Sequence, residues 1–370
     1  MRRKTARLGA LIITVGLALI AVACGESARD AIAPTTSSHE GMIEGSVWVA
    51  DEEGNSLTVI DADTNTAIAR VTGVEGPHNI QAAPDGRSVW AVSGHEALAL
   101  KFDPSAYSLM GAAPTGSEPA HIIVTPDGTT VYVTNGGDDS VTVIDPQTID
   151  VIATIPVGDY PHGLRPSPDG RWVYVANAGG TTLSVIDTST NQVVDEIEVG
   201  QKPVQVGFSS DGRFVYASVN GENAVAKVDV ASRTLVDKLE VGAGPIQVFV
   251  TPDSATLLVA NQGTETNPSR TVSIIDTASF SVVDTVETGA GAHGVVIEPS
   301  GRHAYITNIY ENSVTVLDVE ERRVVANVGT AARPNGISFL AAAPIRPPAF
   351  EIEIDMPEHE EEMPGMENME

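Results

Sequence analysis

The feature that most constrains this chain is a short turn motif that returns at a fixed interval. The turns that begin at positions 84, 126, 168, 210 and 252 are 42 residues apart, and a sixth follows 47 residues later at 299. The first three read Pro-Asp-Gly, and the others are degenerate copies of that tripeptide. Self-similarity at a period of roughly 40 residues indicates a repeat architecture in which each unit is one supersecondary module.

Two further markers recur with the same period. An aspartate closes a short β-type run in each unit: Asp61, Asp103, Asp145, Asp187, Asp229, Asp276 and Asp318. A large side chain occupies one equivalent position in each unit: Trp48, Trp90, Tyr132, Tyr174, Tyr216, Leu258 and Tyr305. Because three markers share one period, the repeat does not depend on any single motif.

Each unit contains four segments with strand character. Around residue 170 these segments are 162–167, 171–177, 182–186 and 192–199. The second alternates aromatic residues with valines, and this period-two pattern predicts a strand. Asp-Gly after Pro is typical of a tight turn between strands. Four antiparallel strands in ~40 residues match one blade of a β-propeller.

The two ends of the repeat region favour a closed ring over an open solenoid. The first copy, 46–71, contains only the second, third and fourth segments of a unit, and the last copy, 335–340, contains only the first. Together they make one complete blade, and their pairing removes the exposed edges that an open sheet would leave. We therefore predict an all-β, seven-bladed propeller of four-stranded antiparallel blades over residues 45–340.

Three of the second segments carry a family resemblance. Val131–Asn135, Val173–Asn177 and Ala304–Asn308 resemble the repeat of the YVTN family of β-propellers, which are YncE-like. The resemblance spans roughly 45–340 and implies the propeller fold. It implies little about activity, because the family includes surface-layer and periplasmic proteins, and related propellers include lactonases and domains of nitrite reductases and amine dehydrogenases.

The first residues predict an export signal. A basic head precedes an uncharged apolar run over 8–23, which is short for a spanning helix of ~20 residues. The run ends at Ala21-Val22-Ala23-Cys24, which resembles the lipobox of bacterial lipoproteins and implies a lipidated Cys24. We predict a signal peptide over 1–23, a tether over 24–44 and a lipoprotein anchored in the periplasm, at the outer membrane or at the cell surface. An ordinary cleaved signal is the alternative.

Charge and cysteine content restrict the partners. The formal net charge is −28, which repels phosphate backbones and disfavours nucleic acid, and the membrane is reached through the lipid anchor only. Basic proteins, peptides, small molecules or metal ions are the partners that such a surface admits. Cys24 is the one cysteine, so the chain has no pair for a disulfide and no attachment motif for a c-type haem.

Histidines gather where the first segments of the units begin. His78, His162, His293 and Asn335 occupy one equivalent position, and the next position holds His121, Gln205 and Gln247. In a propeller these positions lie at the mouth of the central channel, so we expect all seven residues to contribute to a ligand site. Imidazole is a common metal ligand, and His78, His162 and His293 are candidates for a divalent metal. The alternative is that each ring only bonds a neighbouring loop.

These features favour a binding or scaffolding module that works through the channel-mouth face, with no catalytic residue assigned. The competing class is a metal-dependent, lactonase-like hydrolase, since propeller enzymes assemble sites from scattered loops. The additional five residues of the 47-residue unit predict a longer loop within 262–270 on that face.

The last thirty residues differ in composition. Residues 341–350 read as an Ala- and Pro-rich linker, and an acidic segment that we expect to be disordered follows them. It contains a set of soft ligands that suit copper: Met356, His359, Met363, Met366 and Met369. A solvated tail that only aids solubility is the alternative.

Overall fold

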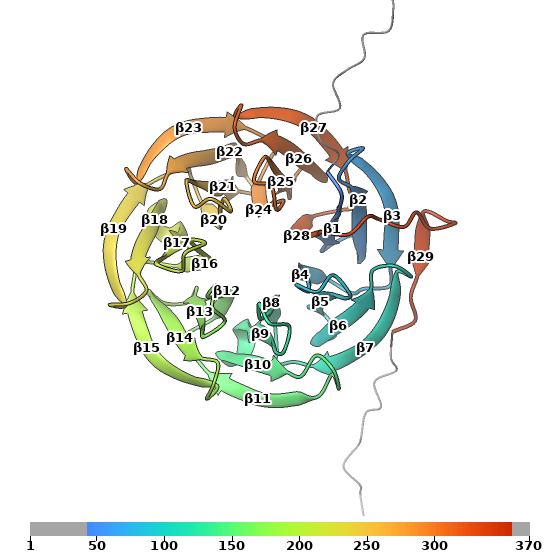
Figure 1. Ribbon diagram of the computed structural model, residues 1–370, viewed down its shortest axis with the longest axis horizontal. Coiled ribbons are helices and arrows are strands. Elements are labelled where there is room, and N and C mark those ends of the chain that lie inside the picture. The colour runs from blue at the N-terminus through green and yellow to red at the C-terminus, as the bar shows by residue number, and fades with distance from the viewer. Residues whose placement is uncertain (1–42, 357–370) are drawn as a thin grey trace, which may run out of the picture. The chain divides into compact units, whose positions relative to one another are not determined.

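The computed structural model describes residues 43–356, and seven antiparallel sheets stand around a central channel (Figure 1). Each sheet is one blade, named here in chain order with its innermost strand first. The first blade contains β28 (Pro334–Leu340), β1 (Ser46–Asp51), β2 (Ser56–Asp61) and β3 (Thr66–Thr72). The second contains β4 (Pro77–Ala82), β5 (Val89–Ser93), β6 (Leu98–Asp103) and β7 (Ser108–Pro114). The third contains β8 (Pro119–Val124), β9 (Val131–Asn135), β10 (Ser140–Ile144) and β11 (Val151–Pro156).

The remaining four blades continue in the same order. The fourth contains β12 (Pro161–Pro166), β13 (Trp172–Asn177), β14 (Thr182–Asp187) and β15 (Gln192–Glu198). The fifth contains β16 (Pro203–Phe208), β17 (Phe214–Val219), β18 (Ala224–Asp229) and β19 (Thr234–Glu240). The sixth contains β20 (Pro245–Val250), β21 (Thr256–Thr264), β22 (Asn267–Asp276) and β23 (Ser281–Glu287). The seventh contains β24 (Ala292–Ile297), β25 (His303–Asn308), β26 (Ser313–Asp318) and β27 (Arg323–Gly329).

The ring closes where the two ends of the propeller meet. β28 pairs with β1 in antiparallel register, with Ser46 opposite Leu340 and Trp48 opposite Ser338. The seven blades and the shared first blade confirm the fold predicted from the partial repeats. Closure gives β28 and the inner edge of β1 a hydrogen-bonded partner, so that the first blade is as complete as the other six.

The aromatic marker of each repeat packs between blades. The six aromatic markers are at most 1% exposed: Trp48, Trp90, Tyr132, Tyr174, Tyr216 and Tyr305. The second and third strands are buried on both faces, because a neighbouring blade covers each face. Burial is continuous along β1 and β9, whereas the outer strand β15 alternates between exposed and partly or fully buried positions.

The repeated aspartates hold the turns. In the third blade, the Asp127 carboxylate accepts hydrogen bonds from the Thr125 hydroxyl and the Thr129 N–H, at 2.6 and 3.1 Å. Gly128 between them has a φ of 71°, in the left-handed region that favours glycine. Asp103, at the end of a third strand, likewise accepts from the Ser105 N–H at 2.8 Å. The aspartates that end third strands are therefore turn residues.

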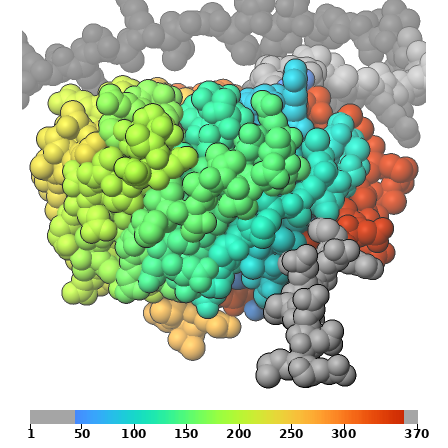
Figure 2. Space-filling view, turned by 90° about the horizontal axis from the view of Figure 1, so that it is seen from below, coloured from blue at the N-terminus to red at the C-terminus, as the bar shows by residue number. Residues whose placement is uncertain are grey.

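The insertion in the sixth blade differs from its predicted form. Instead of a long loop, β21 and β22 extend beyond the sheet as a paired hairpin, with Thr264 opposite Asn267. The additional residues form strand because their backbone groups pair with one another. The orange hairpin projects beyond one face of the propeller in Figure 2.

The structure also contains a strand that the sequence analysis did not predict. Within the segment interpreted as a linker and disordered tail, β29 (Glu351–Glu353) pairs in parallel with β3 on the outside of the first blade (Figure 1). Ile354 is 9% exposed and belongs to the core cluster of the first two blades. The strand forms because the outer edge of β3 offers unpaired backbone groups, a tertiary feature that composition cannot reveal. In the described residues no helix is long and apolar enough to cross a membrane.

Candidate three-histidine site at the channel mouth

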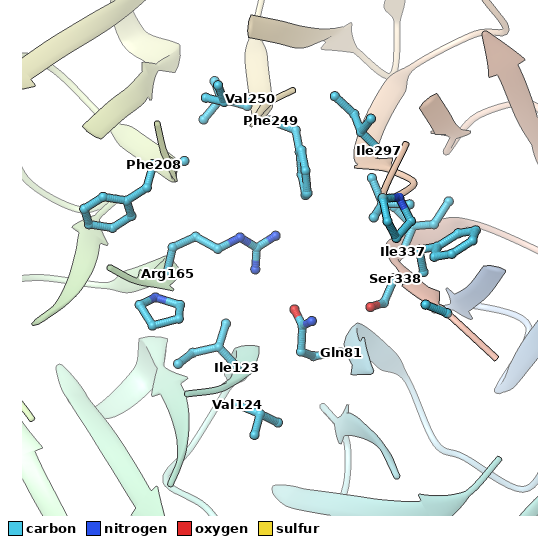
Figure 3. Close-up of a pocket in the computed structure, with 17 residues that line it drawn as sticks. Gln81, Ile123, Val124, Arg165, Phe208, Phe249, Val250, Ile297, Ile337 and Ser338 are labelled. Carbon is cyan, nitrogen blue, oxygen red and sulfur yellow. The ribbon is translucent and has the colours of Figure 1, made fainter. Parts of the chain in front are cut away.

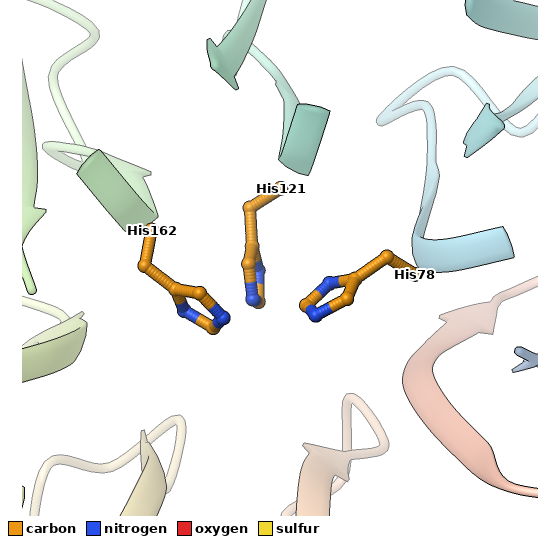
Figure 4. Close-up of side chains that lie close together, drawn as sticks. All are labelled: His78, His121 and His162. Carbon is orange, nitrogen blue, oxygen red and sulfur yellow. The ribbon is translucent and has the colours of Figure 1, made fainter. Parts of the chain in front are cut away.

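The innermost strands bring the predicted histidines to one end of the channel. His78 and His162 are the second residues of β4 and β12, and His121 is the third residue of β8. These strands belong to three consecutive blades, the second, third and fourth. One ligand nitrogen from each ring lies within 4.8 Å of the other two. Figure 4 shows the three rings pointing toward one another.

Ring-to-ring distances describe a compact cluster. The ring centroids of His78 and His121 are 5.5 Å apart, those of His78 and His162 are 5.1 Å apart, and those of His121 and His162 are 4.7 Å apart. A zinc ion with Zn–N distances of ~2.0–2.1 Å needs ligand nitrogens about 3.4 Å apart. The ligand nitrogens, which lie within 4.8 Å of one another, are therefore at most about 1.4 Å further apart than a metal requires.

Backbone carbonyls set the tautomers of two rings. His78 Nδ1 lies 3.0 Å from the Ala120 carbonyl oxygen, and His162 Nδ1 lies 3.2 Å from the Val204 carbonyl oxygen. A carbonyl oxygen only accepts, so each Nδ1 carries the proton, and each neutral ring presents a lone pair on Nε2. The alternative prediction was that each ring only bonds a neighbouring loop, and these two bonds to the next blade agree with it. The same bonds also orient the two rings as metal ligands.

His121 is held by a side chain instead. Gln205 Nε2 lies 3.1 Å from His121 Nδ1, and Gln205 Oε1 accepts from the Val206 N–H at 2.9 Å. The Val206 bond fixes which end of the amide is oxygen, so the amide donates to Nδ1 and the ring proton is assigned to Nε2. That Nε2 is buried and has no hydrogen-bond partner among residues 43–356.

Two glutamines and a glycine complete the support of His121. Gln205 Nε2 also lies 3.4 Å from Gln247 Oε1, so these two predicted residues join the site behind the ring. Gly163 lies between the blades that His121 and Gln205 belong to, and a Cβ there would stand 2.4 Å from Gln205 Oε1. Only glycine leaves room for this glutamine to reach His121.

Burial keeps the rings uncharged at neutral pH. Burial, assisted by the nearby His78 ring, lowers the pKa of His162 to about 3. Burial also lowers the pKa of His78, although the negative charge of Glu52 raises it in part. Burial and then the neighbouring rings hold the pKa of His121 well below its usual value. Neutral imidazole is the form that binds metals.

The structure does not place His293 in the cluster. The sequence pattern predicted a metal site at His78, His162 and His293, whereas the cluster contains His121 as the third ring. The reason is geometric, since His293 belongs to the seventh blade and the three cluster residues come from adjacent blades. Burial lowers the pKa of His293 to about 3, and its Nδ1 has no hydrogen-bond partner in the described chain. Asn335, the last predicted residue, donates to Glu52 at 3.2 Å.

The acidic loops on this face are engaged within the protein. The Asp138 carboxylate accepts from the Ser117 N–H and hydroxyl, and Glu222 pairs with Lys238 at 2.7 Å. Glu311 pairs with Arg270 at 2.8 Å. These three carboxylates therefore already have partners within the protein.

The predicted lipid and copper residues fall mostly outside the described chain. Cys24, His359, Met363, Met366 and Met369 lie outside residues 43–356, so those predictions stand as made. Met356 is described, and its side chain packs against the core cluster of the first two blades. It therefore has a packing role that the sequence analysis did not expect.

Sequence reasoning missed two residues. Arg165 in β12 is the only lysine or arginine in the seven innermost strands, and this signal was readable in the sequence. Asp51 ends β1 at the position where four other blades have asparagine, and it is fully buried. The sequence showed that this position of the repeat usually carries asparagine, but it did not reveal that the Asp51 side chain is buried.

Comparisons with known proteins agree with the architecture. A Kuenenia stuttgartiensis hydrazine synthase chain is 27% identical with a TM-score of 0.66, over 72% of this chain and 90% of that one. A functionally unknown protein from Desulfotomaculum acetoxidans is 16% identical with a TM-score of 0.70, over 81% of this chain and 99% of that one. Dihydro-heme d1 dehydrogenase NirN, in complex with DHE, is 15% identical with a TM-score of 0.61, over 82% of this chain and 77% of that one.

The family comparison covers most of the propeller. No curated protein matches the chain. The model of the YNCE-like beta-propeller family matches residues 100–343, which include the five complete blades from the third to the seventh, the end of the second blade and β28 of the first. The chain therefore belongs to the YNCE-like β-propeller family.

Proposed function

We propose that this protein is an exported, lipid-anchored binding module that holds a divalent transition-metal ion at its channel mouth. The observation that carries the proposal is the convergence of His78, His121 and His162, with ligand nitrogens within 4.8 Å of one another. The family fold is compatible with a binding or scaffolding role. Cys24 supplies the lipid anchor in this proposal.

The chemistry of the donors selects the metal. Three imidazoles suit zinc, copper or nickel, whereas magnesium and calcium prefer oxygen ligands. Three protein ligands leave a fourth position for water or a small ligand. The rings are neutral, so the ion would add positive charge to a chain of net charge −28.

One hydrogen bond must change when a metal binds. His121 can offer Nε2 only if its proton moves to Nδ1, and then Gln205 must turn its carbonyl oxygen toward that ring. Turning the amide gives up the Val206 bond, at a cost of about 1–3 kcal/mol. Binding of structural zinc provides about 10–16 kcal/mol in small zinc domains, so the metal term exceeds this cost.

Zinc titration of the metal-stripped protein tests the proposal. We expect one Zn²⁺ per chain, and we expect His121→Ala to weaken binding by more than the roughly 10–100-fold that changing a residue behind a ligand costs. His95→Ala is the matched control, because His95 is exposed and outside the cluster. Equal zinc affinity in the wild-type and His121→Ala proteins would contradict the proposal.

A hydrolase of the lactonase type remains the second candidate, since a three-histidine centre leaves an open coordination position. The zinc-loaded protein can be assayed on simple lactones. Hydrolysis that disappears in His121→Ala but persists in His95→Ala would replace the binding role with a catalytic one. No hydrolysis from a stoichiometric zinc protein would favour the binding module.

A further inference from the structure

The other end of the channel contains a cavity that the histidine cluster does not use. Its volume is about 370 Å³, in the range of small-molecule pockets. The fifth residue of every innermost strand contributes to its wall: Gln81, Ile123, Arg165, Gly207, Phe249, Val296 and Ser338. His162 and Arg165 are three residues apart on one strand, so the cavity lies ~10 Å further along the channel than the histidines.

Arg165 is the one charged residue among those that line this cavity. Figure 3 shows its side chain extending from β12 toward the centre of the ring. Its Nη1 is buried without a hydrogen-bond partner, and Arg165 forms no ion pair in the described residues. Burial lowers the pKa of Arg165 only to about 10, so the guanidinium stays cationic at neutral pH.

A partly buried cation whose Nη1 is buried without a partner is costly, so its presence points to a ligand of opposite charge. A guanidinium binds a carboxylate through two parallel hydrogen bonds. Across the cavity, Ser338 Oγ accepts from the Ala82 N–H at 2.9 Å and keeps its own proton to donate. Gln81 is the other polar side chain on that side.

The rest of the wall is apolar. Phe208, Phe249 and Ile297 lie on the side of the guanidinium away from Gln81 and Ser338, and Ile337 lies next to Ser338 (Figure 3). A hydrated inorganic ion gains nothing from such a wall, whereas an aromatic or aliphatic body buries its surface there. We propose that this cavity binds a small organic carboxylate, with the carboxylate on Arg165 and its apolar body against Phe249.

Calorimetric titration of the full chain with benzoate tests this inference, and metal is removed first so that the histidine cluster plays no part. We expect Arg165→Gln to weaken benzoate binding about 10- to 100-fold, the range for a buried hydrogen bond to a charged group. Arg87→Gln is the matched control, because Arg87 is an exposed arginine whose loss changes the net charge equally. We expect less than about a 2-fold change in that variant.

Neutral and small probes keep the test decisive even if Arg165→Gln does not fold. On the wild-type protein, benzamide lacks the charge and acetate lacks the apolar body, so we expect both to bind at least ~10-fold more weakly than benzoate. Benzoate binding that is absent, that equals benzamide binding, or that survives Arg165→Gln would overturn the inference. Inorganic phosphate binding more tightly than benzoate would also overturn it, in favour of a simple anion site.

Discussion

Replacing Asp51 by asparagine should stabilise the propeller at neutral pH. In the third, fourth, sixth and seventh blades, the equivalent residue is an asparagine whose amide donates to two hydroxyls of the next strand, as Asn135 does to Ser140 and Thr142 at 3.0 and 2.9 Å. Asp51 instead accepts from Ser56 and Thr58, and its Oδ1 has no partner in the described chain. The first blade therefore buries a carboxyl group where the repeat prefers a neutral amide.

The magnitude follows from the carboxyl group's titration. Burial raises the pKa of Asp51 to about 7, against an ordinary value of about 3.9. A raised folded-state pKa means that the stability contribution is complete below about pH 4 and is lost as pH rises toward 7. At 1.36 kcal/mol per pKa unit, the loss is up to about 4 kcal/mol above pH 7, and about 3 kcal/mol of it falls between pH 4.5 and 7.5.

Urea unfolding of wild-type and Asp51→Asn proteins at pH 4.5 and 7.5 measures this difference. The buried histidines titrate equally in both proteins, so the change in the stability difference isolates Asp51. Asp150→Asn removes an exposed carboxylate and controls for net charge. If the advantage of Asp51→Asn does not grow with pH, or if the variant is less stable at pH 7.5, the reasoning about this buried carboxyl group is wrong.

Four further predictions test closure, support of the site and the two termini. A chain ending at Arg333 lacks β28, with its buried Ile337 and Leu340, and should lose several kcal/mol of unfolding free energy relative to a chain ending at Met356 in urea denaturation. Gln205→Glu should tighten zinc binding about 10-fold in calorimetry, because a carboxylate accepts the His121 Nδ1 proton without an amide rotation. Cys24→Ala should release the protein from membranes, and an unmodified mature cysteine in mass spectrometry would refute lipidation. The chain ending at Met356 keeps β29 and should bind copper(I) more weakly than the full chain if the methionine tail is a copper site.

The sequence by itself determined the propeller. The period of 42 residues, the aspartate turns and the complementary partial repeats are local or periodic signals, and they suffice because each blade solves the same packing problem. The sequence also placed His78, His121 and His162 at one end of the channel, since the second and third positions of the innermost strands lie at the same end of the ring.

Only the tertiary structure decided which of these residues meet. The ring positions place His121, not His293, beside His78 and His162, and Gly163 lets Gln205 fix the His121 tautomer across a blade. The pairing of β29 with β3 likewise depends on an edge that exists only in the folded ring. These features arise from distances across the channel and between segments far apart in the chain, and a repeat pattern contains no information about which side chains reach across.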